Sequence, residues 1–347
     1  MNRVLVLVAA CGLSAILTSC SLSRAQDLRQ SGLALMADGD YGRAAARFEE
    51  AIKKDEPERS AALSRDYRLA GEAFYKAGLI DEARSRYEKA VELQRERIKP
   101  GLLELASELN DLGNALGDQG RLEEAEALVS QSLSIREQNT DARSRAVAES
   151  RNSLGRIYMM AGLNEEARKL FEKSLSGLEK QDPEPGSLVA DVRTNLASLY
   201  FSEGKNEQAE PLFKWALEDY RRDLGNEHPA TANAMNNLAE FYRVTGRLDR
   251  AEPLYRDALV ILESRAPESP QYGSTLNNLA VLYQAQRKFD EAEPLYKKAI
   301  AVLEKSSTDD SPRLGSVLRN LASLYEHTGR QDEGSKLASR ADRILSN

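Results

Sequence analysis

The chain has 347 residues, of which 41% are hydrophobic and 30% charged, and its 48 Lys plus Arg against 55 Asp plus Glu give a net charge of −7. Positive and negative residues alternate, as in RLEEAEA and KFDEAE, so the chain lacks the basic face of a nucleic-acid-binding protein and we expect no nucleic acid partner. Length alone would suggest about two domains.

Residues 1–19, MNRVLVLVAACGLSAILTS, predict a signal peptide that is cleaved on export. Arg3 precedes an uninterrupted apolar run from Val4 to Leu13, and small residues then lead to Cys20. A basic residue before a short apolar segment is typical of export signals. No later segment approaches the ~18 apolar residues that a membrane-spanning helix requires.

The stretch Leu17-Thr18-Ser19-Cys20 resembles the lipobox of bacterial lipoproteins. The resemblance implies that cleavage makes Cys20 the first residue, with lipid on its thiol and its amine, and that residues 20–26 form a short tether. Because Ser21 follows the cysteine where aspartate would signal retention at the inner membrane, the resemblance implies an outer-membrane lipoprotein that faces the periplasm. Cys11 is removed with the leader, so no intramolecular disulfide is expected.

A helical hairpin recurs along the rest of the chain. In NNLAEFYRVTGRLDRAEPLY, residues 236–255, apolar residues before Gly246 fall at i, i+3, i+4 and i+7, and a helical pattern restarts after it. The turn residue is Arg287 in one period and glycine in the others, at a spacing of 39 to 42 residues: Gly39, Gly78, Gly120, Gly162, Gly204, Gly246 and Gly329. One hairpin per fixed period indicates a solenoid, which overrides the length-based estimate and predicts one all-α domain over residues 27–347.

Three second helices contain a proline within the apolar pattern. Pro211, Pro253 and Pro294 each lie in the phrase AEPL. If the helix begins near Asp249 or Arg250, Pro253 lies at the end of the first turn, where N–H groups have few partners within the helix. We therefore expect the helix to continue through the proline with the loss of about one backbone hydrogen bond.

Small and large residues alternate at fixed positions of the repeat. The residue seven before each turn is glycine or alanine, and the residue five after it is alanine except at Gly334. Aromatic residues fill the spaces between helices: Tyr158, Tyr200, Tyr242, Tyr283, Tyr325, Phe48, Tyr87, Phe171, Phe213, Tyr255 and Tyr296. The pattern predicts that two helices approach closely at the small positions, where added bulk would overpack the core.

This alternation resembles the tetratricopeptide repeat, and the 42-residue period with NNLA, the turn glycine and AEPLY is similar to the longer variant typified by kinesin light chains. The resemblance implies a right-handed all-α solenoid of about eight helical hairpins. Repeats three and four have Ser132 and Ser174 where the family prefers alanine. The leader and lipobox argue against a kinesin light chain, so we expect only the repeat module to be shared.

Few residues suggest catalysis or metal binding. The two histidines, His228 and His327, have no histidine or cysteine at metal-ligand spacing, and neither GxxxxGK(S/T) nor GxSxG occurs. His228 precedes Pro229, which favours a turn or helix-cap role. Trp215 lies beside the apolar stripe of its helix, which favours packing in the core or between repeats. We predict a protein that is not an enzyme and has no catalytic residue, cofactor or metal site.

Asparagines recur at one position on the first helices of successive hairpins. In tetratricopeptide domains the first helix of each hairpin lines a concave groove, and an asparagine before the LG or LA pair often bonds the backbone of a bound peptide. The matching positions and the residues just before them are Asn195, Asn236, Asn237, Asn277, Asn278, Arg319 and Asn320. An amide both donates and accepts, which suits an extended peptide. The asparagines could equally bond neighbouring repeats, and the sequence does not separate the two roles.

Together these features predict a non-enzymatic, lipid-anchored scaffold that binds a protein or peptide partner in its groove and supports assembly or recruitment in the bacterial envelope. The membrane is expected as a partner only through the lipid on Cys20. One alternative is an envelope enzyme or carbohydrate-binding protein, which would need a convergent acidic or aromatic pocket. Another is a soluble regulatory array, if the leader is not an export signal.

Overall fold

The computed structural model describes residues 24–55, 61–96, 101–179, 186–306 and 312–346. The predicted signal peptide and Cys20 lie outside these residues. Within them the chain forms helices joined by turns and contains no β-strand, as the predicted all-α class requires. Internal contacts divide the chain into a first unit that ends at Asn139 and a second unit that begins at Thr140.

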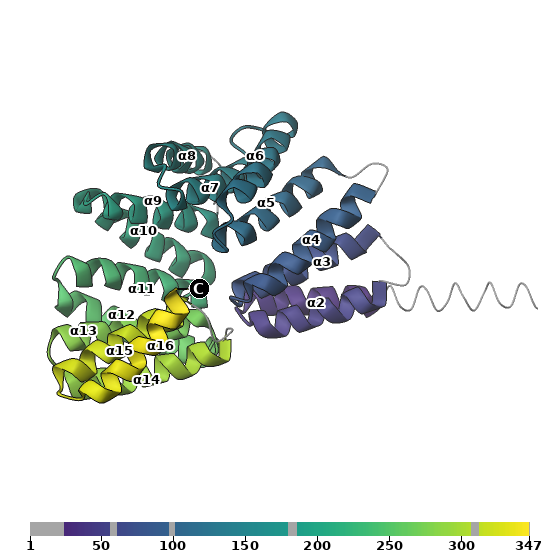
Figure 1. The fold of residues 1–347 in the computed structure, drawn as a ribbon. Helices are drawn as coiled ribbons and strands as arrows, with labels where there is room; N and C mark the ends of the chain where they lie inside the picture. Colours follow the sequence, from purple (N-terminus) through teal and green to yellow (C-terminus); the bar gives the residue numbers. More distant parts are fainter. Residues whose placement is uncertain (1–23, 56–60, 97–100, 180–185, 307–311, 347) are drawn as a thin grey trace, which may run out of the picture. The chain divides into compact units, whose positions relative to one another are not determined.

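The first unit contains three helical hairpins (Figure 1). They are the segment 24–37 with α2 (Tyr41–Asp55), α3 (Ala61–Lys76) with α4 (Ile80–Glu96), and α5 (Leu102–Asp118) with α6 (Leu122–Asn139). α2 packs on α3 and α4 packs on α5, so that each hairpin covers an apolar face of the next.

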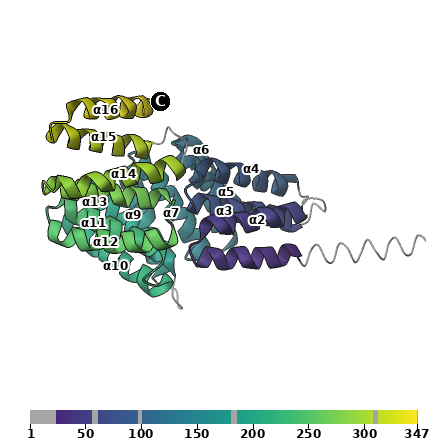
Figure 2. The ribbon, with the colours of Figure 1, turned by 90° about the horizontal axis from the view of Figure 1, so that it is seen from below.

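The second unit contains five hairpins (Figures 1 and 2). They are α7 (Arg145–Met160) with α8 (Asn164–Leu178), α9 (Ser187–Ser202) with α10 (Asn206–Leu224), α11 (Pro229–Val244) with α12 (Leu248–Arg265), α13 (Pro270–Ala285) with α14 (Phe289–Ser306), and α15 (Pro312–His327) with α16 (Gln331–Leu345). The first helices α7, α9, α11, α13 and α15 also contact one another in succession and form what we call the first-helix row. The eight hairpins of the described residues confirm the predicted repeat architecture.

Each hairpin turn contains a residue in the left-handed backbone conformation, at the predicted position. At Gly246, φ is 79°, and the Arg247 amide donates to the Tyr242 carbonyl at 2.8 Å. This bond satisfies a carbonyl that the end of α11 would otherwise leave without a partner. Arg287 adopts the same conformation with φ at 61°, although its side chain disfavours it.

Replacing Arg287 by glycine is therefore expected to stabilise the second unit by about 0.5–1 kcal/mol, because glycine adopts positive φ without the steric penalty of a Cβ atom. Urea unfolding of the two proteins measures the difference. Gly246→Ala, which creates the strained conformation in the preceding hairpin, should be destabilising by a similar amount. A lower stability for Arg287→Gly would show that the arginine side chain contributes more than the backbone strain removes.

The three proline-containing helices are continuous, as predicted, but the position of the proline differs from the prediction. α12 begins at Leu248, earlier than the expected Asp249 or Arg250, so Pro253 lies in the second turn. At that depth its nitrogen would normally bond the carbonyl of Asp249, and this one bond is missing. The buried apolar face of the helix keeps it helical in spite of this loss.

The close approach at the small positions is confirmed. A Cβ atom added to Gly71 would lie 2.7 Å from the ring of Tyr87, and one added to Gly155 would lie 2.6 Å from the ring of Phe171. Ala251, at the other small position, is 0% exposed. At these positions the aromatic rings of the second helix therefore pack directly on the backbone of the first helix, with no room for a larger side chain.

The glutamate of each AEPL phrase joins neighbouring hairpins of the second unit. Arg330, which follows the turn glycine of the last hairpin, donates to Glu293 on α14 at 2.9 Å, and the Tyr325 hydroxyl donates to the same carboxylate at 2.9 Å. The guanidinium of Arg330 also lies 3.7 Å from the ring centre of Tyr325. We call this glutamate, arginine and tyrosine arrangement the inter-repeat clasp.

A second clasp, two hairpins earlier along the chain, has the same three residue types. Arg247 donates to Glu210 at 2.7 Å and lies 4.6 Å from the ring centre of Tyr242. Burial alone would raise the pKa of Glu210, but hydrogen bonds from Arg247 and Lys214 lower it to about 2. The pKa of Glu293 is likewise raised by burial and lowered more strongly by hydrogen bonds, to about 2. Both carboxylates are therefore ionised and paired at neutral pH.

Candidate functional site

Most of the predicted asparagines lie on the first-helix row and bond one another across repeats. Asn195 on α9 donates to Asn152 on α7 at 2.9 Å. Asn278 on α13 donates to Asn236 on α11 at 3.1 Å, and Asn320 on α15 donates to Asn277 on α13 at 2.9 Å. We call these three bonds the asparagine ladder. They are the contacts expected if the asparagines join neighbouring repeats.

The same two repeat positions are joined in the first unit by charged side chains. Arg68 on α3 lies 3.6 Å from Asp111 on α5. Arg68 and Asp111 occupy the positions that hold Asn236 and Asn278 in the ladder. A pair at these positions therefore joins successive first helices whether the side chains are amides or ions. The ladder also leaves polar groups of each amide available, since one amide has two donors and two acceptor sites.

Arg319 does not belong to the ladder. Its guanidinium donates to Asp342 on α16 at 2.7 Å, within the last hairpin. Both side chains are largely exposed, and a salt bridge between exposed groups contributes little to stability. Arg319 is thus accessible on the last first helix, but it is held by a different contact from the predicted asparagines beside it.

Asn237 marks a break in the ladder. The position on α9 that would accept its bond holds Thr194, whose hydroxyl instead donates to the Ala190 carbonyl of its own helix at 2.8 Å. Asn237 is half-buried, and its side chain makes no hydrogen bond to any residue that the structure describes. Among the predicted asparagines, Asn237 is the one whose amide makes no hydrogen bond within the residues that the structure describes.

Asn233 lies one helical turn before Asn237 and was missed by the sequence analysis. It too is half-buried and makes no side-chain hydrogen bond within the described part of the chain. Residues at i and i+4 share one face of a helix, so the spacing of the two asparagines carried this information. We call Asn233 and Asn237 the amide pair.

Glu240 and Arg243 continue the same face of α11 but are paired with each other. The Arg243 guanidinium donates to Glu240 at 2.6 and 2.8 Å, and the buried Tyr255 hydroxyl donates to Glu240 at 2.7 Å. Burial raises the pKa of Glu240, but the bonds from Arg243 and Tyr255 outweigh it and lower the pKa. The carboxylate is held ionised and fully bonded, so it suits a structural role better than proton transfer.

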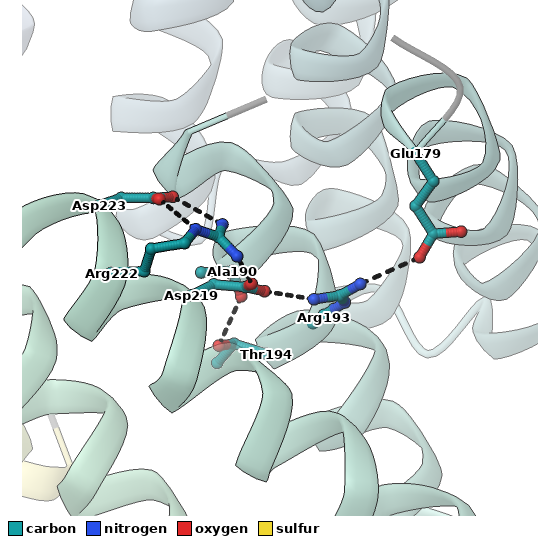
Figure 3. A network of polar contacts seen from close by, with 7 residues as sticks. All are labelled: Glu179, Ala190, Arg193, Thr194, Asp219, Arg222 and Asp223. Atoms are coloured by element: carbon teal, nitrogen blue, oxygen red, sulfur yellow. Dashed lines mark hydrogen bonds and ion pairs between the residues drawn. The ribbon is translucent and has the colours of Figure 1, made fainter. Parts of the chain in front are cut away.

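A charged network lies around the fifth hairpin (Figure 3). Arg193 on α9 pairs with Asp219 on α10 and with Glu179 at 3.1 Å. Arg222 bonds Asp219 at 3.0 Å and Asp223 at 2.9 Å. The Asp219 side chain is only 6% exposed. Because the buried carboxylate is paired with two guanidinium groups, the network joins helices and offers no free charge to a ligand.

The sequence favours packing of Trp215 in the core or between repeats, and the core position is wrong. Trp215 lies on α10 and is 49% exposed, with the guanidinium of Arg193 5.8 Å from its ring centre. Its neighbours Phe213 and Ala216 are buried, so they occupy the apolar stripe and Trp215 points to its edge. A position beside the stripe was visible in the sequence, but its exposure depends on the packing of α10.

His228 has the predicted cap role. Its ring Nδ1 accepts a hydrogen bond from the Ala230 amide at 3.1 Å, and Pro229 begins α11. In the described residues, no three His, Cys, Asp or Glu side chains are grouped to hold a metal ion. Among the same residues, no helix combines the length and the apolar character needed to cross a membrane.

Comparison with known proteins identifies the repeats. A tetratricopeptide repeat profile matches residues 104–180, 188–264 and 271–341, and a second tetratricopeptide repeat profile matches residues 29–102. No curated protein sequence is significantly similar to the chain.

Several solved structures share its fold. BtubC (BKLC) from P. vanneervenii is 24% identical, with a TM-score of 0.55 over 65% of this chain and 91% of that chain. A Rap protein complexed with competence and sporulation factor is 13% identical, with a TM-score of 0.65 over 93% of this chain and 98% of that chain. The Rap conjugation gene regulator of plasmid pLS20, complexed with the Phr* peptide, is 17% identical, with a TM-score of 0.63 over 82% of this chain and 73% of that chain.

The family profiles span most of the eight hairpins, and their boundaries follow the observed helices. The turn positions, the small residues at helix crossings and the aromatic residues over them account for the match in physical terms. This chain belongs to the tetratricopeptide repeat family.

Proposed function

We propose that the protein is a non-enzymatic scaffold that binds an extended peptide segment of a protein partner on the first-helix row of its second unit. The observation that carries the proposal is the amide pair of Asn233 and Asn237, half-buried on α11 and without a hydrogen bond within the described residues. No polar atom of either amide is buried without a partner, so both amides face solvent and a ligand can reach them.

The amide pair matches the chemistry of a peptide backbone. Each amide donates and accepts, and an extended backbone presents both kinds of group along its edge. Two bonds of the asparagine ladder join α11 to α13 and α13 to α15, so the pair lies on a helix held by its neighbour and not on a loop. A preorganised surface loses less entropy when it binds a flexible segment.

The similar structures support this reading of the fold. One Rap protein was solved with competence and sporulation factor, and another with the Phr* peptide. Their resemblance to this chain extends to the fold alone, and the residues that would bind a peptide here are argued from this chain's own amides.

Replacing Asn237 by alanine is expected to weaken peptide binding a few-fold without lowering the melting temperature, because one net hydrogen bond contributes about 0.5–1.5 kcal/mol. Asn233→Ala together with Asn237→Ala should reach or exceed about tenfold. Peptides selected from a random phage-displayed library on the purified protein provide the probe, and fluorescence anisotropy gives the affinity.

Two further variants separate binding from folding. Asp257→Ala changes an exposed residue on α12 and should alter neither quantity. Asn278→Ala removes a ladder bond and should lower the free energy of unfolding by about 0.5–1.5 kcal/mol. If every selected peptide binds the double Asn233, Asn237 variant as tightly as the parent, the first-helix row is not the binding surface.

We also propose that the scaffold is an outer-membrane lipoprotein facing the periplasm, anchored through lipid on Cys20, and that its partner is an envelope protein. The proposal is motivated by the leader and by Leu17-Thr18-Ser19-Cys20. The lipobox resemblance implies three acyl chains, two in a diacylglycerol on the thiol and one on the amine, and these would exceed the two signals that stable anchoring needs. Crosslinking in isolated envelopes, followed by mass spectrometry, would identify the partner.

Cys20→Ala is expected to release the protein from the membrane fraction, because the acyl chains would have no attachment site. Detergent phase partitioning of the parent and the variant measures this directly. Cys11→Ala is the matched control, since that cysteine precedes the predicted cleavage site. Retention of Cys20→Ala in the detergent phase would exclude the lipobox interpretation.

A further inference from the structure

α11, which carries the amide pair, and α13, the next first helix, contain few charged residues. α13 contains no Asp, Glu, Lys or Arg, and α11 contains only Glu240 and Arg243, which are paired with each other. α14, the second helix of the α13 hairpin, carries charges in most of its turns, among them Asp290, Glu293, Lys297 and Glu304. Because the whole chain is 30% charged, α11 and α13 contain fewer charged residues than the chain average.

Half-buried amides and hydroxyls occupy the accessible positions instead. They are Asn233, Asn236 and Asn237 on α11, and Ser274, Asn277 and Asn278 on α13. We call these six residues the neutral face. It can bond a peptide backbone, but it has no unpaired charge with which to compensate a charged side chain of the ligand.

The lack of charge on the neutral face disfavours ligands with charged side chains. A charged side chain loses its hydration when it is covered by a protein surface, and the loss is restored only by an opposite charge or several strong hydrogen bonds. The two charged residues of α11, Glu240 and Arg243, already neutralise each other at 2.6 Å, and Asp191 on the neighbouring helix α9 already accepts a hydrogen bond from the Tyr220 hydroxyl. The face would therefore discriminate against peptides with charged side chains, which it cannot pair, as well as in favour of the backbone groups that it binds.

We infer that the neutral face takes an extended peptide segment that carries no charged side chain, and that this binding depends little on ionic strength. The inference rests on the proposed function and specifies the partner: an uncharged, polar or small-residue segment recognised through its backbone. Salt weakens binding by screening attraction between charges, and a contact without charge pairs has no such attraction to lose.

Peptides selected from the random phage-displayed library, and synthesised without the phage, provide the test. Their dissociation constants are measured at about 50 and about 500 mM salt, and should change by less than about twofold. A lysine or a glutamate placed at the centre of such a peptide should each weaken binding by about tenfold or more. The Asn233, Asn237 double variant establishes which peptides bind at this face.

A charge introduced on the face should reverse the selectivity. Ser274→Lys is expected to admit glutamate-containing peptides, with an affinity that now falls as salt is raised. Peptides that need the amide pair but are rich in charge and bind in a salt-dependent manner would overturn this inference and leave the proposed function intact. Peptides that do not need the amide pair at all would overturn both.

Discussion

Ala251→Leu is expected to lower the free energy of unfolding of the second unit by about 1–3 kcal/mol. Ala251 is 0% exposed, and Tyr255, one turn further along α12, is also 0% exposed. The added carbon atoms would have to enter the contact between α11 and α12, and well-packed cores do not yield without displaced side chains or backbone. Urea unfolding followed by circular dichroism measures the change.

Asp257→Leu is the matched control for Ala251→Leu. It introduces the same side chain on the same helix, but at an exposed position, where substitutions usually change stability by less than about 0.5 kcal/mol. Similar unfolding free energies for the two leucine variants would contradict the close approach of the helices. Because Ala251 lies in the hairpin of the amide pair, a large effect would also show that this hairpin is tightly packed.

The repeat architecture could be predicted because one physical requirement recurs in every period. A hairpin needs a residue with positive φ at its turn and small residues where its helices cross, and both constraints act within about forty residues of sequence. Arg287 shows how strong the pattern is, since it adopts a φ of 61° where its own preference is against it. The surrounding hairpin, and not the local residue, determines that turn.

Departures from the family pattern needed the structure to be understood. Ser132 and Ser174 replace alanine in buried positions, and their hydroxyls donate to the carbonyls of Ala106 at 2.5 Å and Ala148 at 2.7 Å. A buried hydroxyl is tolerated when it finds such a partner, and both partners lie on the other helix of the hairpin. A distance of 26 residues in sequence hides this pairing from local patterns.

The candidate site was only partly predictable for the same reason. The sequence placed asparagines at one repeat position, but their roles depend on the residue that faces them in the neighbouring hairpin. Asn278 faces Asn236 and is bonded, whereas the position that faces Asn237 holds Thr194, which bonds its own helix. The predicted peptide-binding role of the asparagines stays a prediction, and the structure narrows its first test to Asn237 and to Asn233 beside it.

The inter-repeat clasps lead to the second large effect, which is a loss of stability in acid. The pKa values of Glu210 and Glu293 are lowered from 4.5 to about 2, so the folded protein holds these carboxylates ionised where the unfolded chain would protonate them. Their contribution is fully present above about pH 4.5 and is lost as the pH falls toward about 2. Each clasp should contribute roughly 1 kcal/mol, because partial exposure of the carboxylates screens the interaction.

Replacing both Glu210 and Glu293 by glutamine is therefore expected to lower the free energy of unfolding by about 2 kcal/mol near neutral pH. The difference between the parent and this variant should shrink as the pH is lowered, because the parent loses the stabilisation that the variant never had. The control variant Glu218→Gln removes a carboxylate from an exposed position in the middle of α10, away from the helix ends. It should follow the parent at every pH. If the parent and the clasp variant lose stability in parallel between about pH 5 and 2, the clasps do not contribute to stability. The hairpins from α9–α10 to α15–α16 would then be joined by apolar packing alone.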